Sequence, residues 1–325
     1  MGDSRPRPCS AHERPMIVTS HHAGLSPAQV ESVAGLTAGS VATLVVHPLD
    51  IVKTRMQIHR GSVGRSSTVS TLAIVRSLTC SPQPIASLYR GLTPNLVGNA
   101  ASWASFFFFK TRLERALASY KAAGDRARLT PLDYFAASGG AGMLTQVLTN
   151  PIWVLKTRIL SSDRGADGAY PGMLSGAARL LRDEGVRGFY RGLGISMLGV
   201  SHGAVQFAVY EPAKRLYFTQ KKRVSRGRDK MTTESTIGIS SLAKLVAGIV
   251  TYPQQVLRSR LQTYDADTRF GRGVVEVVRR IWREEGVRGF YRGIATGVVR
   301  VMPATWVTFL VYENVKFYLP RLVDG

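Results

Sequence analysis

The sequence Pro-Leu-Asp-Ile-Val-Lys-Thr-Arg at residues 48–55 occurs three times in the chain in related forms. It returns as Pro-Ile-Trp-Val-Leu-Lys-Thr-Arg at residues 151–158 and as Pro-Gln-Gln-Val-Leu-Arg-Ser-Arg at residues 253–260, at spacings of 103 and 102 residues. A second marker, Tyr-Arg-Gly, begins at residues 89, 190 and 291, and its last two copies end the longer string Glu-Gly-Val-Arg-Gly-Phe-Tyr-Arg-Gly. Two markers with one period indicate three units of about 100 residues, which are larger than the repeats of a soluble helical solenoid.

Each unit contains two apolar stretches, one before the proline motif and one after Tyr-Arg-Gly. The later stretches have roughly the 20 residues that a helix needs to cross a bilayer. They lie at residues 92–109, 193–210 and 294–312. Small residues four apart, such as Gly35 and Gly39, predict close approach of another helix, as in membrane proteins. The polar segment between the stretches predicts a short amphipathic helix, most clearly at residues 274–285.

The 325 residues carry 43 Lys and Arg against 21 Asp and Glu, which gives a net charge of +22. This balance favours an anionic partner, such as a nucleic acid, an anionic membrane surface or a charged solute. The two cysteines exclude a disulfide scaffold and a cysteine-based zinc site. Charged residues within the apolar stretches are expected to face a protein interior or a water-filled cavity, because a charge facing lipid is costly.

Two other classes of protein fit the sequence less well. A nucleic-acid-binding helical repeat protein would interleave aromatic and basic residues on exposed faces, but here the aromatic residues cluster in apolar stretches. An enzyme is disfavoured because Gly192-Leu-Gly194 lacks the third glycine of a dinucleotide fingerprint and no catalytic or metal-binding arrangement stands out. Residues 1–27 contain no apolar stretch, so we expect a flexible tail and no secretory signal.

The threefold Pro-x-acid-x-x-base-x-base motif, followed by a polar segment and aromatic-base-Gly, resembles the mitochondrial carrier family over roughly residues 28 to 318. The resemblance implies an all-α membrane protein with six transmembrane helices, arranged as three pseudo-symmetric two-helix repeats with short matrix helices around a central cavity. We place the repeats at residues 28–120, 128–222 and 232–320. The resemblance also implies a multi-pass carrier of the mitochondrial inner membrane that works as a monomer, binds anionic lipids such as cardiolipin and has no cofactor.

The three motif prolines are expected to shape the cavity. Pro48, Pro151 and Pro253 each remove one backbone hydrogen bond and bend a helix, so that three helices can converge and close one end. In the family, the acid of one motif pairs with a base of the next motif. The resemblance therefore implies a matrix gate with an Asp50–Lys156 ion pair.

Two of the motifs depart from the family pattern at the position where most carriers have an acid. There, Trp153 offers Arg258 a cation–π contact, and Gln255 offers Lys53 a hydrogen bond. The predicted matrix gate has one ion pair where the idealised family has three, so we expect it to open easily. Two further residues match the glutamines that brace the gate in the family: Gln57 and Gln262.

An aromatic-acid-x-x-base motif lies at the end of the second apolar stretch of a repeat, on the side of the membrane opposite the proline motifs. It resembles the second gate of the family, which faces the cytoplasmic side. Its residues in the second and third repeats are Tyr210, Glu211, Lys214, Tyr312, Glu313 and Lys316. Glu211 is predicted to pair with Lys316 across the bundle. The first repeat has Lys110 in place of the acid, so this network is expected to be incomplete.

Basic residues without an opposing acid predict a positive cavity. Lys53, Arg258 and Lys244 would concentrate anions there, and a position at the membrane interface is the alternative for Lys244. Arg300 stands at a solute contact position of the family, and arginine suits bidentate contact with phosphate or carboxylate.

Four other residues are candidates for contact with the flat rings of a solute. Gly199 and Val200 resemble the Gly-aliphatic pair by which nucleotide carriers accept adenine, and helix packing is the alternative for them. Asn99 and Trp103 lie four residues apart on one helix face. Trp103 can stack on a ring of the solute, or it can be a core residue or an interfacial anchor.

Trp153 and Gln255 resemble the branch of the family that carries FAD, folate, NAD and pyrimidine nucleotides. Residues 35–50 are most similar to the fungal FAD carriers, and folate carriers are near relatives. We therefore expect transport of FAD by alternating access, with FAD as the cargo and not as a prosthetic group. The alternatives are folate, NAD and a pyrimidine nucleotide, and the charges alone leave FAD and folate open.

Overall fold

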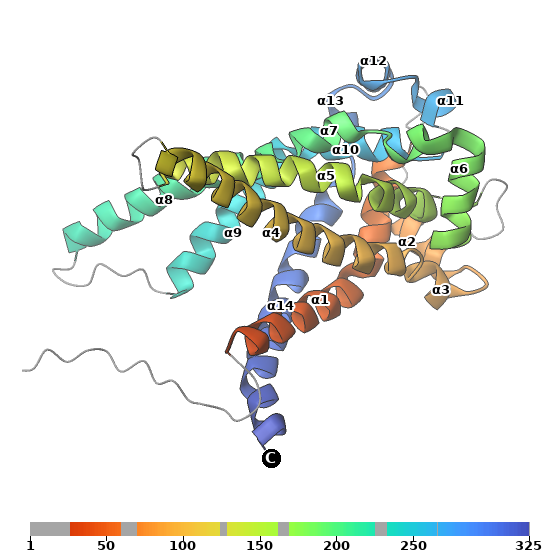
Figure 1. Ribbon diagram of the computed structural model, residues 1–325. Helices are drawn as coiled ribbons and strands as arrows, with labels where there is room; N and C mark the ends of the chain where they lie inside the picture. The colour runs from red at the N-terminus through yellow and green to blue at the C-terminus, as the bar shows by residue number, and fades with distance from the viewer. Residues whose placement is uncertain are drawn as a thin grey trace, which may run out of the picture.

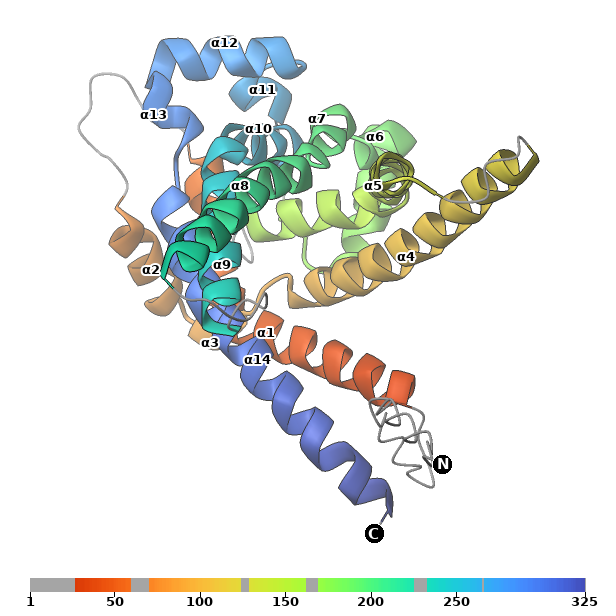
Figure 2. The ribbon, with the colours of Figure 1, turned by 90° about the vertical axis from the view of Figure 1, so that its left-hand side faces the viewer.

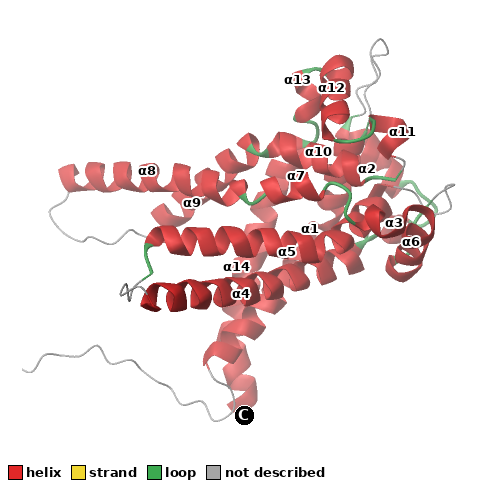
Figure 3. Cartoon of the chain, turned by 45° about the horizontal axis from the view of Figure 1, so that its top comes forward, coloured by secondary structure: helices red, strands yellow, loops and turns green. Residues whose placement is uncertain are grey.

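The computed structural model describes residues 27–59, 70–123, 129–161, 169–224, 233–264 and 266–324, so the predicted tail lies almost wholly outside the described residues. Every regular element in these ranges is a helix, which confirms the all-α fold class (Figure 3). The long helices are α1 (Pro27–Ile58), α4 (Leu92–Ala123), α5 (Pro131–Ser161), α8 (Ser201–Val224), α9 (Thr233–Val250) and α14 (Ile294–Asp324). The short helices are α2 (Thr71–Thr79), α3 (Pro84–Leu88), α6 (Met173–Phe189), α7 (Leu193–Leu198), α10 (Tyr252–Gln262), α11 (Ala266–Phe270), α12 (Val274–Glu285) and α13 (Val287–Phe290).

The long helices pack in three pairs: α14 with α1, α4 with α5, and α8 with α9 (Figure 1). Each pair joins the last helix of one repeat to the first helix of another, and the α14–α1 pair joins the last described helix to the first (Figure 2). The pairs come together near the proline motifs, where α2, α6 and α12 also lie, and they spread apart towards their other ends. We call these two regions the convergent end and the spread end.

The prolines affect the first helices of the three repeats differently. Pro48 lies within the continuous helix α1 and Pro151 within α5. The helix of the third repeat is interrupted at Thr251, and Pro253 lies in the first turn of its second part, α10. The second helix of repeat 2 is likewise divided at Gly199, between α7 and α8. Two of the six predicted spans therefore consist of two helical pieces.

In α1, close packing uses small residues, but in a register one residue away from the predicted one. Ala34, Ala38 and Ala42 of α1 are buried at four-residue spacing. Within the described residues, no atom of another helix would lie within 4 Å of a Cβ placed on Gly35 or Gly39. The prediction that these two glycines mediate the approach was wrong, because the stripe that faces α14 begins at the preceding alanine.

The buried core lies at the convergent end. One apolar cluster joins α1 and α2 with Leu160, a second joins α5 and α6, and a third joins α7, α10 and α12. The predicted amphipathic helix at residues 274–285 matches α12, which buries Val277 and Ile281 in the third cluster. The short helices α2, α6 and α12 thus each pack against a proline-motif helix and hold the convergent end together.

The spread end instead presents apolar side chains outward. Leu36, Phe107 and Trp306 are each more than half exposed in the chain alone, as expected for surfaces that meet lipid. Among the residues that the structure describes, three helical segments are both long and apolar enough to cross a membrane: Val30–Ile58, Leu193–Phe218 and Val287–Arg321. The helices α4 and α5 have 32 and 31 residues, so their length also suffices.

Candidate functional site

A cavity of about 200 Å³ lies among α1, α8, α9, α10 and α14, close to the convergent end. Its polar lining includes three basic side chains, Lys53, Lys244 and Arg300, together with His202 and Gln255. No carboxylate is among the described residues that line it. The cavity is therefore electropositive and suits an anionic group. Of the two positions considered for Lys244, the structure shows the one in the cavity.

Lys53 is held at the edge of this cavity by the third repeat. Its Nζ donates a hydrogen bond to Oε1 of Gln255 at 2.9 Å, which confirms the predicted contact. The same ammonium lies 5.6 Å from the ring centroid of Tyr252. The Tyr252 hydroxyl in turn donates to the backbone oxygen of Arg292 at 3.0 Å. Because these contacts are neutral, the positive charge of Lys53 is oriented but not cancelled.

The partner of Asp50 differs from the prediction. Its Oδ1 lies 2.6 Å from Nε of Arg300, so the acid of the first motif pairs with a basic residue that lines the cavity. Lys156 donates instead to Oδ1 of Asn95 at 2.8 Å. The predicted direct Asp50–Lys156 pair was wrong, because the long side chain of Arg300 reaches the carboxylate from α14 while Asn95 stands beside Lys156.

Trp153 occupies the acid position of the second motif and contacts two cations. The Arg258 guanidinium carbon lies 5.8 Å from its ring centroid, which confirms the predicted cation–π contact. Lys156 Nζ lies 5.0 Å from the same ring. The predicted matrix gate thus combines one ion pair, amide hydrogen bonds and cation–π contacts among the described residues.

The two predicted bracing glutamines are buried and join neighbouring repeats. The Oε1 of Gln57 accepts a hydrogen bond from the Ser259 hydroxyl at 2.8 Å. The Oε1 of Gln262 accepts from the Thr157 hydroxyl at 3.3 Å, and its Nε2 donates to Asn150 at 3.3 Å. Gln57 links repeat 1 to repeat 3, and Gln262 links repeat 3 to repeat 2. Their role as braces remains a prediction that these contacts support.

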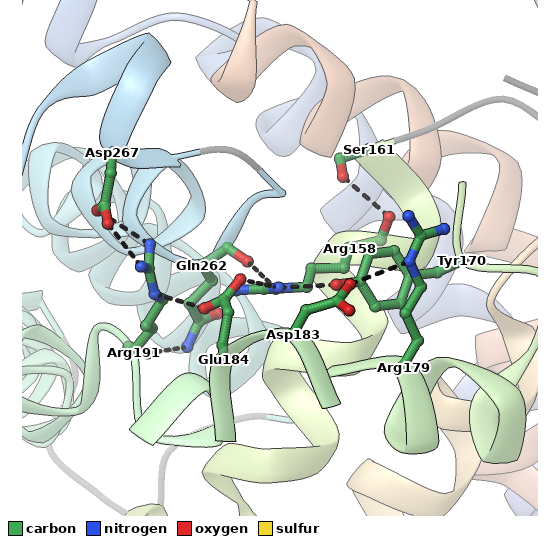
Figure 4. Close-up of polar contacts among 9 residues, drawn as sticks. All are labelled: Arg158, Ser161, Tyr170, Arg179, Asp183, Glu184, Arg191, Gln262 and Asp267. Carbon is green, nitrogen blue, oxygen red and sulfur yellow. Dashed lines mark hydrogen bonds and ion pairs between the residues drawn. The ribbon is translucent and has the colours of Figure 1, made fainter. Parts of the chain in front are cut away.

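Next to the gate lies an ionic network that the sequence analysis did not identify (Figure 4). Arg158 is fully buried, and its Nη1 and Nη2 donate to the two carboxylate oxygens of Glu184 at 2.5 and 3.0 Å. Glu184 also accepts from Arg191 at 2.8 Å, and Arg191 pairs with Asp267 of α11 at 2.7 Å. This chain of ion pairs joins the second repeat to the third.

The third repeat has the equivalent arrangement and joins the first repeat. Arg260 donates to Glu285 at 2.6 and 3.0 Å, and Glu285 also accepts from Arg292 at 2.8 Å. Arg292 donates to the backbone oxygen of His59 at 2.9 Å, just beyond α1. Burial lowers the pKa of the His59 ring, and the nearby Arg292 guanidinium lowers it further, so this ring is neutral at physiological pH. The first repeat has Gln83 where the others have glutamate. The sequence signal for this network was the string Glu-Gly-Val-Arg-Gly-Phe-Tyr-Arg-Gly, which begins at Glu184 and again at Glu285.

The predicted cytoplasmic gate is not formed at the spread end. Lys316 lies 3.7 Å from Glu31 of α1 instead of pairing with Glu211. Helix α8, which carries Glu211, extends away from α14 (Figure 1). The aromatic residues of the two motifs make cation–π contacts with the bases on their own helices, Tyr210 with Lys214 and Tyr312 with Lys316. Glu313 is exposed. The expected Glu211–Lys316 pair is thus absent, because the two helices that would bring its partners together have spread apart.

The four predicted ring contacts lie outside the lining of the cavity. A Cβ on Gly142 would lie 3.1 Å from Cγ2 of Val200, and a Cβ on Gly199 would lie 3.2 Å from Nε2 of Gln254. Helix packing, the alternative for these two residues, therefore accounts for them. Trp103 is 63% exposed and stacks on Phe107 at 5.8 Å between ring centroids. The half-buried Asn99 lies one turn before Trp103 on α4.

A family model described as mitochondrial carrier protein matches residues 26–121, 127–221 and 229–322. The chain belongs to the mitochondrial carrier family. It is 38% identical over 308 residues to the mitochondrial FAD carrier protein FLX1 of Saccharomyces cerevisiae, with 90% of this chain and 98% of that protein covered. It is 33% identical over 290 residues to the chloroplastic folate transporter 1 of Arabidopsis thaliana, with 87% and 93% covered.

A third relative of this carrier is the chloroplastic nicotinamide adenine dinucleotide transporter 1 of Arabidopsis thaliana. It is 34% identical over 309 residues, with 94% of this chain and 96% of that protein covered. Membership of the family confirms the helical membrane fold and a multi-pass place in the mitochondrial inner membrane. Members of this family are transporters.

Proposed function

We propose that this carrier moves FAD across the mitochondrial inner membrane by alternating access. The observation that carries the proposal is the cavity at the convergent end, where Lys53, Lys244 and Arg300 gather without a carboxylate in the described lining. The similarity to a yeast FAD carrier along nearly the whole chain supports the same solute.

The diphosphate of FAD is the group that this lining suits. A guanidinium binds phosphate oxygens through two parallel N–H donors, and an ammonium adds a point charge without fixing one direction. Arg300 on α14 and Lys244 on α9 approach the cavity from different helices. A diphosphate between them would leave the two ring systems free to extend towards the wider spread end. Trp103, and Asn99 one turn before it, remain candidates to contact a ring there.

Arg300 gives the proposed site a connection to the gate. The residue lines the cavity and is also the direct ionic partner of Asp50. A phosphate bound to Arg300 competes with Asp50 for the same guanidinium. Because a ligand shifts only an equilibrium whose states it binds differently, FAD must bind the occluded state more tightly than the open state. We assign the convergent end to the matrix side, so that the described state is open to the intermembrane space.

The lipid and oligomer assignments belong to this proposal as well. One chain supplies all three repeats and its own cavity, so we propose that the carrier functions as a monomer. Its apolar outer face meets the bilayer. The net charge of +22 favours anionic lipids such as cardiolipin around it.

Uptake into liposomes tests the proposed solute. Purified carrier is reconstituted, and uptake of FAD, FMN, folate, NAD and pyrimidine nucleotides is measured one at a time against vesicles without protein. We expect saturable uptake of FAD that the other solutes inhibit only weakly. Saturable uptake of folate that FAD does not inhibit would contradict the proposal and identify folate as the solute. The two carboxylates of folate suit the same three cations.

A further inference from the structure

Asn95 lies between the two residues that were expected to form the ion pair of the gate. It follows Gly91 by one turn at the start of α4, and its side chain is only 2% exposed. Nζ of Lys156 lies 2.8 Å from its Oδ1. Its Nδ2 lies 3.4 Å from Oδ2 of Asp50 and 3.3 Å from Nδ1 of His47. One neutral side chain therefore contacts the acid of repeat 1 and the base of repeat 2.

The hydrogen-bonding capacity of these groups sets the direction of each bond. A lysine ammonium only donates, so the amide oxygen of Asn95 must face Lys156. The amide nitrogen then faces Asp50 and His47, with one N–H available for each. Nδ1 of His47 must accept, which leaves its Nε2 protonated and donating to the backbone oxygen of Arg90 at 2.9 Å. Every polar atom of the Asn95 side chain is used in this arrangement.

We propose that Asn95 is a positioning residue of the gate, which couples Asp50 to Lys156 in place of a direct ion pair. The inference rests on the proposed transport function, because it assigns these contacts to a gate. Asp50 already has an ionic partner in Arg300, and Lys156 lies over the ring of Trp153. The amide joins the two charges without adding a third. It also links repeats 1 and 2 through hydrogen bonds of an uncharged side chain. The rearrangement to the opposite state can break these bonds and form others.

A double-mutant cycle on Asp50 and Lys156 measures the proposed role directly. The coupling is the difference between the effect of the double variant and the sum of the two single effects. Asp50→Ala, Lys156→Met and the double variant are prepared in the full-length carrier, first with Asn95 and then with Asn95→Ala. The readout is the midpoint temperature of unfolding in detergent without any solute. With Asn95 present, we expect the unfolding temperature of the double variant to fall by less than the sum of the two single decreases. The reason is that the contacts of Asp50 and of Lys156 both involve the side chain of Asn95. With Asn95→Ala, the two losses should add.

Two further variants separate this role from a general structural one. Asn95→Leu keeps a side chain of similar size without a charge and loses the acceptor and both donors, so it should also abolish the coupling and remains informative if Asn95→Ala does not fold. Ser102→Ala removes a half-buried α4–α5 contact with Thr149 elsewhere on the same helix and should leave the coupling unchanged. A coupling that is equal or larger without Asn95 would overturn the inference. Because the readout needs no solute, a failure to transport FAD is distinguishable from a failure of this proposal.

Discussion

The convergent and spread ends of the carrier are built from the same six spans but held in different ways. At the convergent end, the fully buried Arg158 and the nearly buried Arg260 bind glutamates, and three apolar clusters surround them. At the spread end, the ionic partner of Lys316 is Glu31 on the helix packed beside its own, and Glu211 does not reach it. Among the described residues, buried ion pairs and apolar clusters therefore hold the convergent end shut, while the ion pairs at the spread end lie within single helix pairs and the Lys316–Glu31 pair is exposed.

The largest expected effect comes from breaking the buried network at the convergent end. Glu285 has a side chain that is 5% exposed and binds both Arg260 and Arg292. Glu285→Ala leaves two guanidinium groups without this carboxylate, so we expect a loss of about 3–5 kcal/mol in the free energy of unfolding. Chemical unfolding in detergent measures it.

A surface ion pair on the same helix, α12, provides the control for that experiment. Arg280 and Glu284 pair at 3.2 Å while both remain partly exposed. Arg280→Ala should cost below about 1 kcal/mol, because solvent screens an exposed pair. Equal losses in the two variants would contradict the view that the buried network holds the convergent end together.

The cavity near the convergent end gives the next effect in size. Lys244→Gln removes one cation from the lining and keeps a polar side chain. A hydrogen bond to a charged group is worth roughly 1.5–3 kcal/mol, so the KM for FAD should rise about tenfold or more. Lys110→Gln is the matched control, because Lys110 lies outside the cavity and faces Glu114 one turn along α4. An unchanged KM for the Lys244 variant would remove it from the proposed site.

A smaller effect is expected from the aromatic part of the gate. Trp153 contacts Arg258 and Lys156 through its ring, and cation–π contacts are worth about 0.5–2 kcal/mol each. Trp153→Leu keeps an apolar side chain but removes the ring. We expect faster exchange of FAD and a lower unfolding temperature, because the gate opens more easily. Trp153→Phe should retain most of both properties, and slower exchange in the leucine variant would contradict this role.

The smallest effect is expected at the spread end. Glu211→Gln should change the unfolding temperature of the solute-free carrier by less than the uncertainty of the measurement, because Glu211 is exposed and does not reach Lys316. Lys316→Gln loses only an exposed contact with Glu31. If either variant were as destabilising as Glu285→Ala, the two ends would not differ in the way described.

The sequence predicted the parts of this arrangement that repeat. The threefold motif predicted six spans, and the pattern of apolar residues predicted α12. The two departures from the motif predicted the partners of Lys53 and Arg258, because a glutamine and a tryptophan offer specific contacts to a cation.

Contacts that depend on the reach of a side chain could not be read from spacing. Repeat symmetry shows that Asp50 faces the centre, but it does not show that Arg300 is close enough to bind it. Asn95 belongs to no repeated motif, so its place beside Lys156 required the structure. The prediction placed the stripe of small residues in α1 one residue too late, at Gly35 and Gly39. Each of these glycines directly follows an alanine, and the alanines are the buried residues.

Access to the cavity from each side of the membrane tests the central claim most directly. Cys9 and Cys80 are replaced by serine, and Val298→Cys places one thiol in the cavity lining. A membrane-impermeant maleimide is then applied to mitoplasts, which expose the intermembrane side, and to inverted inner-membrane vesicles, which expose the matrix side. We predict labelling only from the intermembrane side without solute, with labelling from the matrix side appearing when saturating FAD drives turnover. Equal labelling from both sides without FAD would contradict a cavity that is closed at its convergent end.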